Sequence, residues 1–149
     1  MAENLLKQPI LEEDQILKLI PQKPPFVMVD SLYEYTALTG KMGFTIPPDN
    51  LLVEKGIFSE PGVIEHMAQS MSLHRGYRGF IAGLDKPQTG FIGAIKSVEV
   101  LELPKAGSTL TTFVEILHEI MMVTLVTART EDQNGKLIAT SEMRTVTVD

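Results

Sequence analysis

PGVIEHMAQSMSLHR, residues Pro61–Arg75, is the stretch that decides the fold of this chain. It contains no proline after Pro61 and few β-branched residues, which favours a helix. Only a helix that is buried on most of its sides needs a broad apolar arc. We therefore predict a long central helix around which the rest of the chain folds. The apolar residues that recur at helical spacing are Val63, Ile64, Met67, Ala68, Met71 and Leu73.

The segments on either side of this helix predict an antiparallel sheet. Stretches rich in Val, Ile and Thr alternate with turn sequences, and Asn134–Gly135 is a strong hairpin signal because both residues tolerate positive φ. A short amphipathic helix is expected at 11–20. Together these elements predict an α+β fold in which a curved antiparallel sheet of about five or six strands wraps the long helix. The expected strands are 26–35, 40–46, 90–103, 109–120, 121–131 and 136–148.

Length and composition limit the classes of protein to which the chain can belong. Its 149 residues, 44% of them hydrophobic, predict one domain over 1–149, with 1–10 as an N-terminal extension. With 13 Lys and Arg against 19 Asp and Glu, the formal net charge is −6. An acidic chain without a basic cluster argues against a nucleic acid or an anionic membrane as partner. The absence of cysteine excludes disulfides and thiolate chemistry and fits the cytoplasm, where we expect the protein.

The sequence predicts neither a membrane segment nor a metal site. The first residues lack an uninterrupted apolar run, which argues against a signal peptide, and no run of about 18 apolar residues is present to span a membrane. The histidines share no local spacing typical of metal ligands. We expect His118 to lie in the core or at a dimer interface. Gly76, Gly79 and Gly83 match no phosphate-binding motif and are expected in a flexible loop after the helix.

Glu65 and Gln69 are the polar residues of the predicted helix that point to chemistry. They lie four residues apart and so share one face of the helix. A buried carboxylate is unfavourable unless it is paired or functional. Two interpretations stay open: a Glu–Gln pair at a helix surface or dimer contact, or a carboxylic acid that exchanges a proton with a substrate. His66 follows Glu65 directly, and neighbouring residues of a helix point about 100° apart. His66 is therefore expected to serve in packing or at an interface rather than to form a dyad with Glu65.

Three motifs resemble those of the 3-hydroxyacyl-[acyl carrier protein] dehydratases. LIPQKPPFVMVD at 19–30 is similar to the opening LLPHRxPFLLVD of that family, and IEHMAQ at 64–69 is similar to its central-helix motif IEAMAQ. GAI at 93–95, followed by PKAGS at 104–108, resembles its GI…VVPGD stretch. The motifs occur in the same order as in the family. The resemblance implies the hotdog fold, a long helix wrapped by a curved antiparallel sheet, with dimers that form by joining sheets.

The resemblance also implies a chemistry. In the family, water is removed from a 3-hydroxyacyl thioester carried by acyl carrier protein or coenzyme A, and no cofactor is needed. Glu65 would protonate the departing hydroxyl, and Gln69 would support it. The backbone amides near Pro61, Gly62 and Val63 would polarise the thioester carbonyl at the start of the helix.

The acyl chain needs an apolar pocket, and an acidic carrier protein needs a basic surface. We expect an elongated pocket beside Glu65, lined by residues such as Met67, Met71 and Phe91. A sheet edge with unpaired backbone groups predicts a dimer, either a homodimer or a heterodimer with a homologous dehydratase. Four basic residues are candidates for the carrier surface: Arg75, Arg78, Lys86 and Lys96.

The catalytic histidine of the family is absent from this chain. The family places it in GHFPxxPxMPG before the helix, where this sequence has GIFSEPG at 56–62 with Ile57 in the place of the histidine. A gapless count from Glu65 reaches Leu51 instead, and Gln22 replaces the histidine of the opening motif. A positioned base contributes typically about 10²–10⁴-fold, so we expect a weak dehydratase at best.

This departure resembles a divergent, aryl-polyene-type branch of the dehydratases, and it leaves three functions open. The first is a dehydratase with an unusual base, either His66 or a residue of a partner chain. The second is a non-catalytic, acyl-binding partner subunit of an active dehydratase. The third is a hotdog thioesterase, in which a helix carboxylate such as Glu65 activates water.

Overall fold

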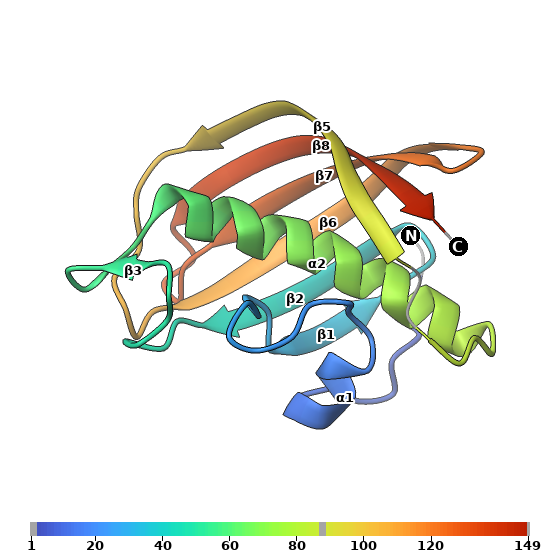
Figure 1. Ribbon diagram of the computed structural model, residues 1–149, viewed down its shortest axis with the longest axis horizontal. Helices are drawn as coiled ribbons and strands as arrows, with labels where there is room; N and C mark the ends of the chain where they lie inside the picture. Colours follow the sequence, from blue (N-terminus) through green and yellow to red (C-terminus); the bar gives the residue numbers. More distant parts are fainter. Residues whose placement is uncertain (1–2, 87–88, 149) are drawn as a thin grey trace.

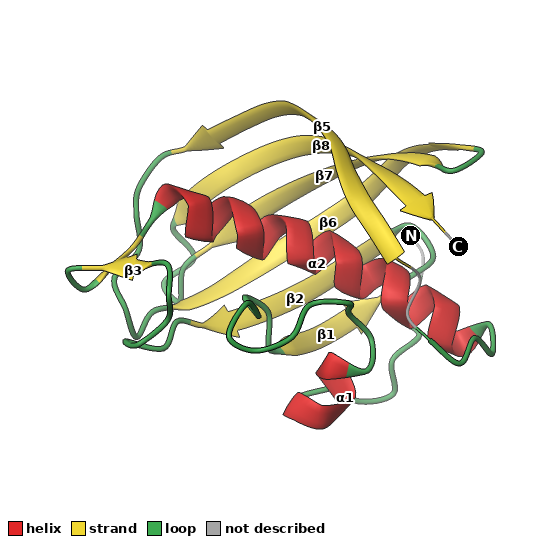
Figure 2. Cartoon of the chain, in the orientation of Figure 1, coloured by secondary structure: helices red, strands yellow, loops and turns green. Residues whose placement is uncertain are grey.

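The computed structural model describes residues 3–86 and 89–148, and in it a long helix lies across a curved antiparallel sheet (Figures 1 and 2). The helix, α2, spans Glu60–Ile81. The sheet has six strands in the order β1-β2-β6-β7-β8-β5, so the predicted α+β architecture is confirmed. The strands are β1 Ser31–Tyr35, β2 Thr39–Thr45, β5 Thr89–Val100, β6 Thr109–Ile120, β7 Val123–Glu131 and β8 Leu137–Val148.

The buried side of α2 packs against the inner face of the sheet. Val63, Met67 and Leu73 have no exposed surface, and they belong to one hydrophobic cluster with Leu110 of β6 and Met143 of β8. Burial of one such side chain stabilises a fold by about 1.5–3 kcal/mol. The broad apolar arc of the sequence is therefore what holds the helix against the sheet.

The central helix is longer than its sequence predicts. It continues beyond Arg75 to Ile81, so Gly76 and Gly79 are buried inside it and the expectation of a flexible loop at these two glycines is wrong. A Cβ atom at Gly76 would lie 1.6 Å from the carbonyl oxygen of Leu19. The glycine thus lets the helix backbone touch the segment that follows α1 (Glu13–Leu17).

Two expected strand starts are wrong for local reasons. β1 begins only at Ser31, because the backbone of the preceding loop binds a side chain of α2 rather than a neighbouring strand. β7 begins at Val123, because Met121 has a positive φ of 56° and forms the tight turn after β6. The sequence also missed a small hairpin of β3 (Val53–Glu54) and β4 (Ile57–Phe58) before α2.

The two edges of the sheet differ in how they are covered. The predicted N-terminal extension lies along β1: Leu5 N–H donates to Tyr35 O at 2.8 Å, and Ile10 forms a bridge with Leu32. β5 is the opposite edge, and in the described part of the chain β8 is its one neighbour. Its side chains Phe91 (57% exposed), Ile92 and Ile95 stand largely in solvent, so β5 is the edge that can add a further strand.

The close contact between Gly76 and Leu19 predicts that a larger residue at position 76 destabilises the fold. The methyl group of Gly76→Ala would clash with the backbone carbonyl of Leu19. A backbone group cannot move aside as easily as the flexible end of a side chain. We expect the free energy of unfolding to fall by about 2–3 kcal/mol, although alanine favours a helix over glycine. Urea unfolding measures the change.

Ser72→Ala is the matched control on the same helix, since Ser72 is half-buried, and its effect should stay within about 0.5 kcal/mol. A Gly76→Ala protein as stable as the wild type would contradict the close contact between α2 and the segment after α1.

Candidate functional site

Gln69 connects the central helix to the loop before β1. It is fully buried, and its Oε1 accepts a hydrogen bond from Met28 N–H at 2.5 Å. Its Nε2 donates to Phe26 O at 2.8 Å and to Glu65 Oε1 at 2.9 Å. The expected contact between Glu65 and Gln69 is present, and Gln69 also satisfies two backbone groups of the loop.

Glu65 lies on the part of α2 that remains accessible. Its side chain is half-buried, on a partly exposed stripe with Ile64, Ala68 and Ser72. Gln69 holds Oε1, while Oε2 has no hydrogen-bond partner among the described residues. This oxygen is the group of the predicted site that can meet a ligand or a second chain.

His66, in contrast, points into the core. It has no exposed surface; its Nδ1 lies 2.6 Å from Met28 O and its Nε2 lies 2.7 Å from Thr112 Oγ1, which in turn lies 2.6 Å from Thr130 Oγ1. Burial lowers the pKa of His66 to about 4, so the ring is neutral near pH 7. A neutral ring that donates from Nδ1 to Met28 O accepts at Nε2 from Thr112. Both nitrogens are thereby committed inside the protein.

The backbone amides at the start of α2 are already partly engaged. Pro61 has no N–H to donate, and Val63 N–H donates to Ser59 O at 3.0 Å. Gly62 N–H donates to the N-cap hydroxyl of Ser59 across 3.4 Å, which is a long hydrogen bond. The ring of Phe58 packs against Gly62, since a Cβ atom there would lie 2.5 Å from the ring. Of the two N–H groups at Gly62 and Val63, that of Gly62 therefore makes the weaker hydrogen bond.

The apolar residues predicted for an acyl pocket do not come together in the single chain. Met67 is fully buried in the core, and Met71 lines a small cavity with His74 and Arg75. Phe91 is exposed on the edge strand β5.

The four predicted basic residues do not form one surface. Arg78 makes a two-pronged ion pair with Glu119, at 2.6 and 3.0 Å, and Arg75 donates to Thr124 Oγ1 at 2.7 Å. The side-chain hydrogen bond from Arg78 lowers the pKa of the Glu119 carboxyl. Lys96 pairs with Glu142 at 2.9 Å. Lys86 lies apart from these three, exposed after the end of α2.

The other two histidines, His74 and His118, lie in different surroundings. His74 is buried, its Nε2 lies 2.9 Å from Thr36 O, and burial lowers its pKa to about 4. His118 is exposed, so of the two expected positions the core is wrong, and a dimer interface stays a prediction. A shift in strand register between Ile116 and His118 interrupts the alternation on which that expectation depended. Among the described residues, no group of three or more His, Asp or Glu side chains could hold a metal ion.

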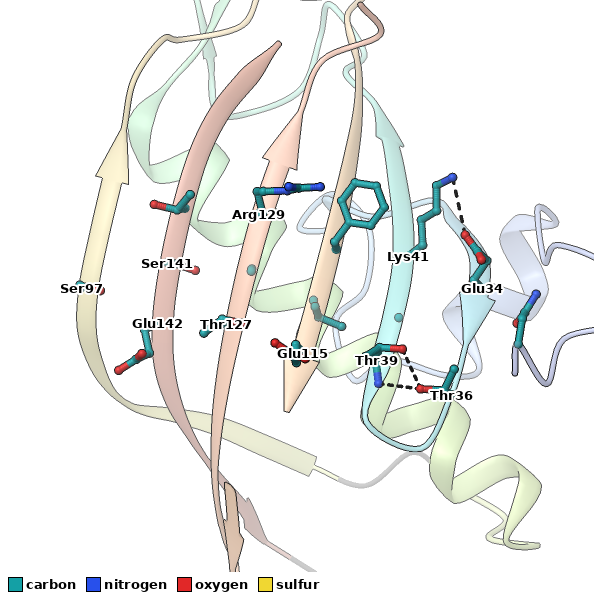
Figure 3. A pocket seen from close by; sticks show the side chains of 16 residues that line it. Glu34, Thr36, Thr39, Lys41, Ser97, Glu115, Thr127, Arg129, Ser141 and Glu142 are labelled. Atoms are coloured by element: carbon teal, nitrogen blue, oxygen red, sulfur yellow. Dashed lines mark hydrogen bonds and ion pairs between the residues drawn. The ribbon is translucent and has the colours of Figure 1, made fainter. Parts of the chain in front are cut away.

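A second hollow, of about 700 Å³, lies on the face of the sheet away from α2 (Figure 3). Four of its five charged side chains have partners within the chain: Lys41 lies 3.7 Å from Glu34, Arg129 lies over the ring of Phe113 at 4.9 Å, and Glu142 pairs with Lys96 at 2.9 Å. None of the site residues predicted from the sequence lines it. We therefore place the candidate site at Glu65 and Gln69.

A long helix across a curved six-stranded antiparallel sheet defines the hotdog fold, and the helix carries a half-exposed carboxylate, Glu65, bound to the buried amide of Gln69. The family model of the ApeP-like proteins, described as ApeP dehydratase, matches residues 14–148. The chain therefore belongs to the ApeP-like dehydratase family, and the predicted dehydratase resemblance is confirmed.

Solved structures share this fold at low sequence identity. The dehydratase heterocomplex ApeI:P from Xenorhabdus doucetiae has a TM-score of 0.82 at 15% identity, over 90% of this chain and 91% of that chain. A hypothetical thioesterase with coenzyme A from Streptococcus pneumoniae has a TM-score of 0.64 at 13% identity, over 78% and 84%. The PaaI protein of the Escherichia coli phenylacetic acid degradation operon has a TM-score of 0.63 at 10% identity, over 81% and 80%. A search of the curated proteins finds no match.

Sequence reasoning found Glu65 and Gln69 but missed what Gln69 binds. The helix motif carried the signal for the Glu65–Gln69 contact, because four-residue spacing is local. No local signal links Gln69 to the backbone of Phe26 and Met28, or His66 to Thr112.

In the described part of the chain, no helix is long and apolar enough to cross a membrane.

The buried imidazole of His66 predicts a pH-dependent stability. Its pKa is about 4 in the folded chain against 6.5 for an ordinary histidine, so the unfolded chain binds the proton more readily between these values. The free energy of unfolding should fall as pH drops through this window, by at most about 1.4 kcal/mol per pH unit for one such histidine. Urea unfolding of the wild type and of His66→Gln at pH 7, 6 and 5 tests this.

We expect His66→Gln to be less stable at pH 7, by about 1–3 kcal/mol, and to have a shallower pH dependence than the wild type. His118→Gln, at the exposed end of β6, should keep the wild-type dependence. Equal slopes for the wild type and His66→Gln would show that the ring is not held neutral by the core.

Proposed function

We propose that this protein binds 3-hydroxyacyl thioesters, carried by acyl carrier protein or coenzyme A, and pairs along β5 with a homologous, catalytically complete dehydratase. In this proposal it contributes little dehydration by itself. The observation that carries the proposal is the commitment of His66 to the core, which leaves Glu65 without a base beside it.

Dehydration of a 3-hydroxyacyl thioester needs two groups in opposite protonation states. A base removes the C2 proton, and an acid protonates the hydroxyl that leaves from C3. Glu65 suits the second step, because Gln69 orients its Oε1 and leaves Oε2 accessible. Gly62 N–H could polarise the thioester carbonyl once Ser59 releases its long hydrogen bond.

Among the described residues, the first step has no suitable group near Glu65 in the single chain. His66 uses both ring nitrogens in buried hydrogen bonds. Ile57, at the position of the family's histidine, lies in β4 and carries an apolar side chain. These positions favour a subunit that binds the acyl thioester over one that eliminates water alone.

Pairing along β5 is supported by the edge itself. The strand is 12 residues long, it is the last strand of the sheet, and it exposes Phe91, Ile92 and Ile95. A long edge of this kind is a template for a strand from another chain. The structural relative with a TM-score of 0.82 is itself described as a dehydratase heterocomplex. A partner on this edge would also cover the exposed side chain of Phe91.

The activity test incubates the pure protein with a 3-hydroxyacyl-coenzyme A and follows enoyl product and free acid by mass spectrometry. We expect enoyl formation far below a typical enzyme rate of about 1 s⁻¹, and no free acid. Glu65→Gln should lower this residual rate further, because Glu65 is the group proposed to protonate the leaving hydroxyl. Urea unfolding of the variant serves as the check that it folds.

A wild type that forms enoyl product at about 1 s⁻¹ or faster, with loss of activity in Glu65→Gln, would instead make Glu65 part of a complete active site. Release of free acid that depends on Glu65 would favour the thioesterase interpretation. Either outcome contradicts the proposal of a non-catalytic subunit.

The pairing test mixes the protein with a hotdog dehydratase of the same organism that retains the catalytic histidine. Light scattering should detect a one-to-one complex, which requires a buried area above about 1,000 Å². Ile95→Lys should abolish it, because a charge would be buried at the joined edge. Leu38→Lys is the matched control, since Leu38 is 53% exposed near the other edge of the sheet. A complex that tolerates Ile95→Lys, or a wild type that stays a homodimer in the mixture, contradicts pairing with a homologue through β5.

A further inference from the structure

A groove of about 1050 Å³ lies between the N-terminal segment and the last turns of α2. Its helix wall carries Tyr77 and Phe80, and Leu5 and Leu17 form part of the opposite wall. Phe80 is 62% exposed, Leu5 is 57% exposed and Leu84, also in the lining, is 46% exposed. The groove therefore presents a concave apolar surface to solvent, which is unfavourable unless something covers it.

Four lysines surround this apolar surface: Lys7, Lys18, Lys23 and Lys86. All four are exposed, and none of them forms an ion pair with another described residue. Asp85 is the one acidic residue in the lining. A chain with a formal net charge of −6 thus gathers positive charge at one apolar groove, and such a place attracts anions. We call it the lysine-rimmed groove.

The lysine-rimmed groove is separate from the candidate site at Glu65. Gly76, which lines the groove, lies eleven residues after Glu65 on the same helix, a separation of about 16 Å along its axis. The N-terminal segment that forms the other wall lies along β1, and β1 and β5 are opposite edges of the sheet (Figure 1).

We propose that the lysine-rimmed groove binds an amphiphile with one apolar chain and an anionic head, either a carboxylate or a phosphate. The chain would lie against Tyr77, Phe80 and Leu84, and the head would meet the lysines of the rim. The volume is that of a small-molecule site, and its concave form suits a flexible chain better than the flat surface of a folded protein. This proposal does not depend on the proposed dehydratase pairing.

The test titrates the full-length protein with dodecanoate, dodecyl phosphate and dodecanol below their aggregation limits, by isothermal titration calorimetry. We expect saturable one-to-one binding of the two anions, at least about tenfold tighter than of the alcohol, and weaker binding at high salt. In NMR spectra, the backbone amides of Gly76 and Gly79 should shift on binding. Vesicles of phosphatidylglycerol form a further arm, which distinguishes a single amphiphile from a membrane surface.

Two kinds of variant locate the binding site. Lys18→Gln with Lys86→Gln should weaken the binding of dodecanoate about tenfold, and Phe80→Asp should abolish it. Lys105→Gln with Lys136→Gln removes the same charge away from the groove and should leave the affinity unchanged. The proposal is overturned if neither anion binds saturably, if binding ignores the groove variants, or if the protein binds vesicles but no single amphiphile.

Discussion

The hydrogen bonds from Gln69 and His66 to the loop before β1 are the interactions on which the central part of this molecule depends. Buried backbone groups need partners, and for Phe26 and Met28 the side chains of α2 supply them. Gln69 binds Met28 N–H and Phe26 O, and His66 binds Met28 O. Two polar side chains on a mostly apolar helix are thus explained by the backbone that they satisfy.

This arrangement also decides what the helix motif can do chemically. Glu65 and His66 are neighbours in sequence but occupy opposite environments, one at the accessible stripe of α2 and one in the core. Gln69 holds the Glu65 carboxylate at this stripe through a hydrogen bond. The imidazole is used to hold the loop and the sheet together, through Thr112 and Thr130. The contact between Glu65 and Gln69 is therefore present on the helix, whereas His66 serves the core.

The N-terminal segment makes the two edges of the sheet unequal. By lying along β1 it covers that edge with its own hydrogen bonds, and it leaves β5 as the edge at which a second chain can add. The same segment forms one wall of the lysine-rimmed groove against α2. Pairing along one edge and ligand binding near the other can thus occur on the same molecule without sharing residues.

The sequence by itself determined the long buried helix, most of the strands and the contact between Glu65 and Gln69, because each follows from local periodicity or from four-residue spacing. The tertiary structure decided the rest. The helix continues through Gly76 because its backbone meets Leu19, the loop at 26–30 is no strand because Gln69 and His66 take its backbone groups, and His118 is exposed because the register shifts beside it. The lysines of the groove come from segments far apart in the chain. Local patterns specify which face of an element is buried, whereas the partners of a backbone group or a surface charge depend on segments that meet only when the chain folds.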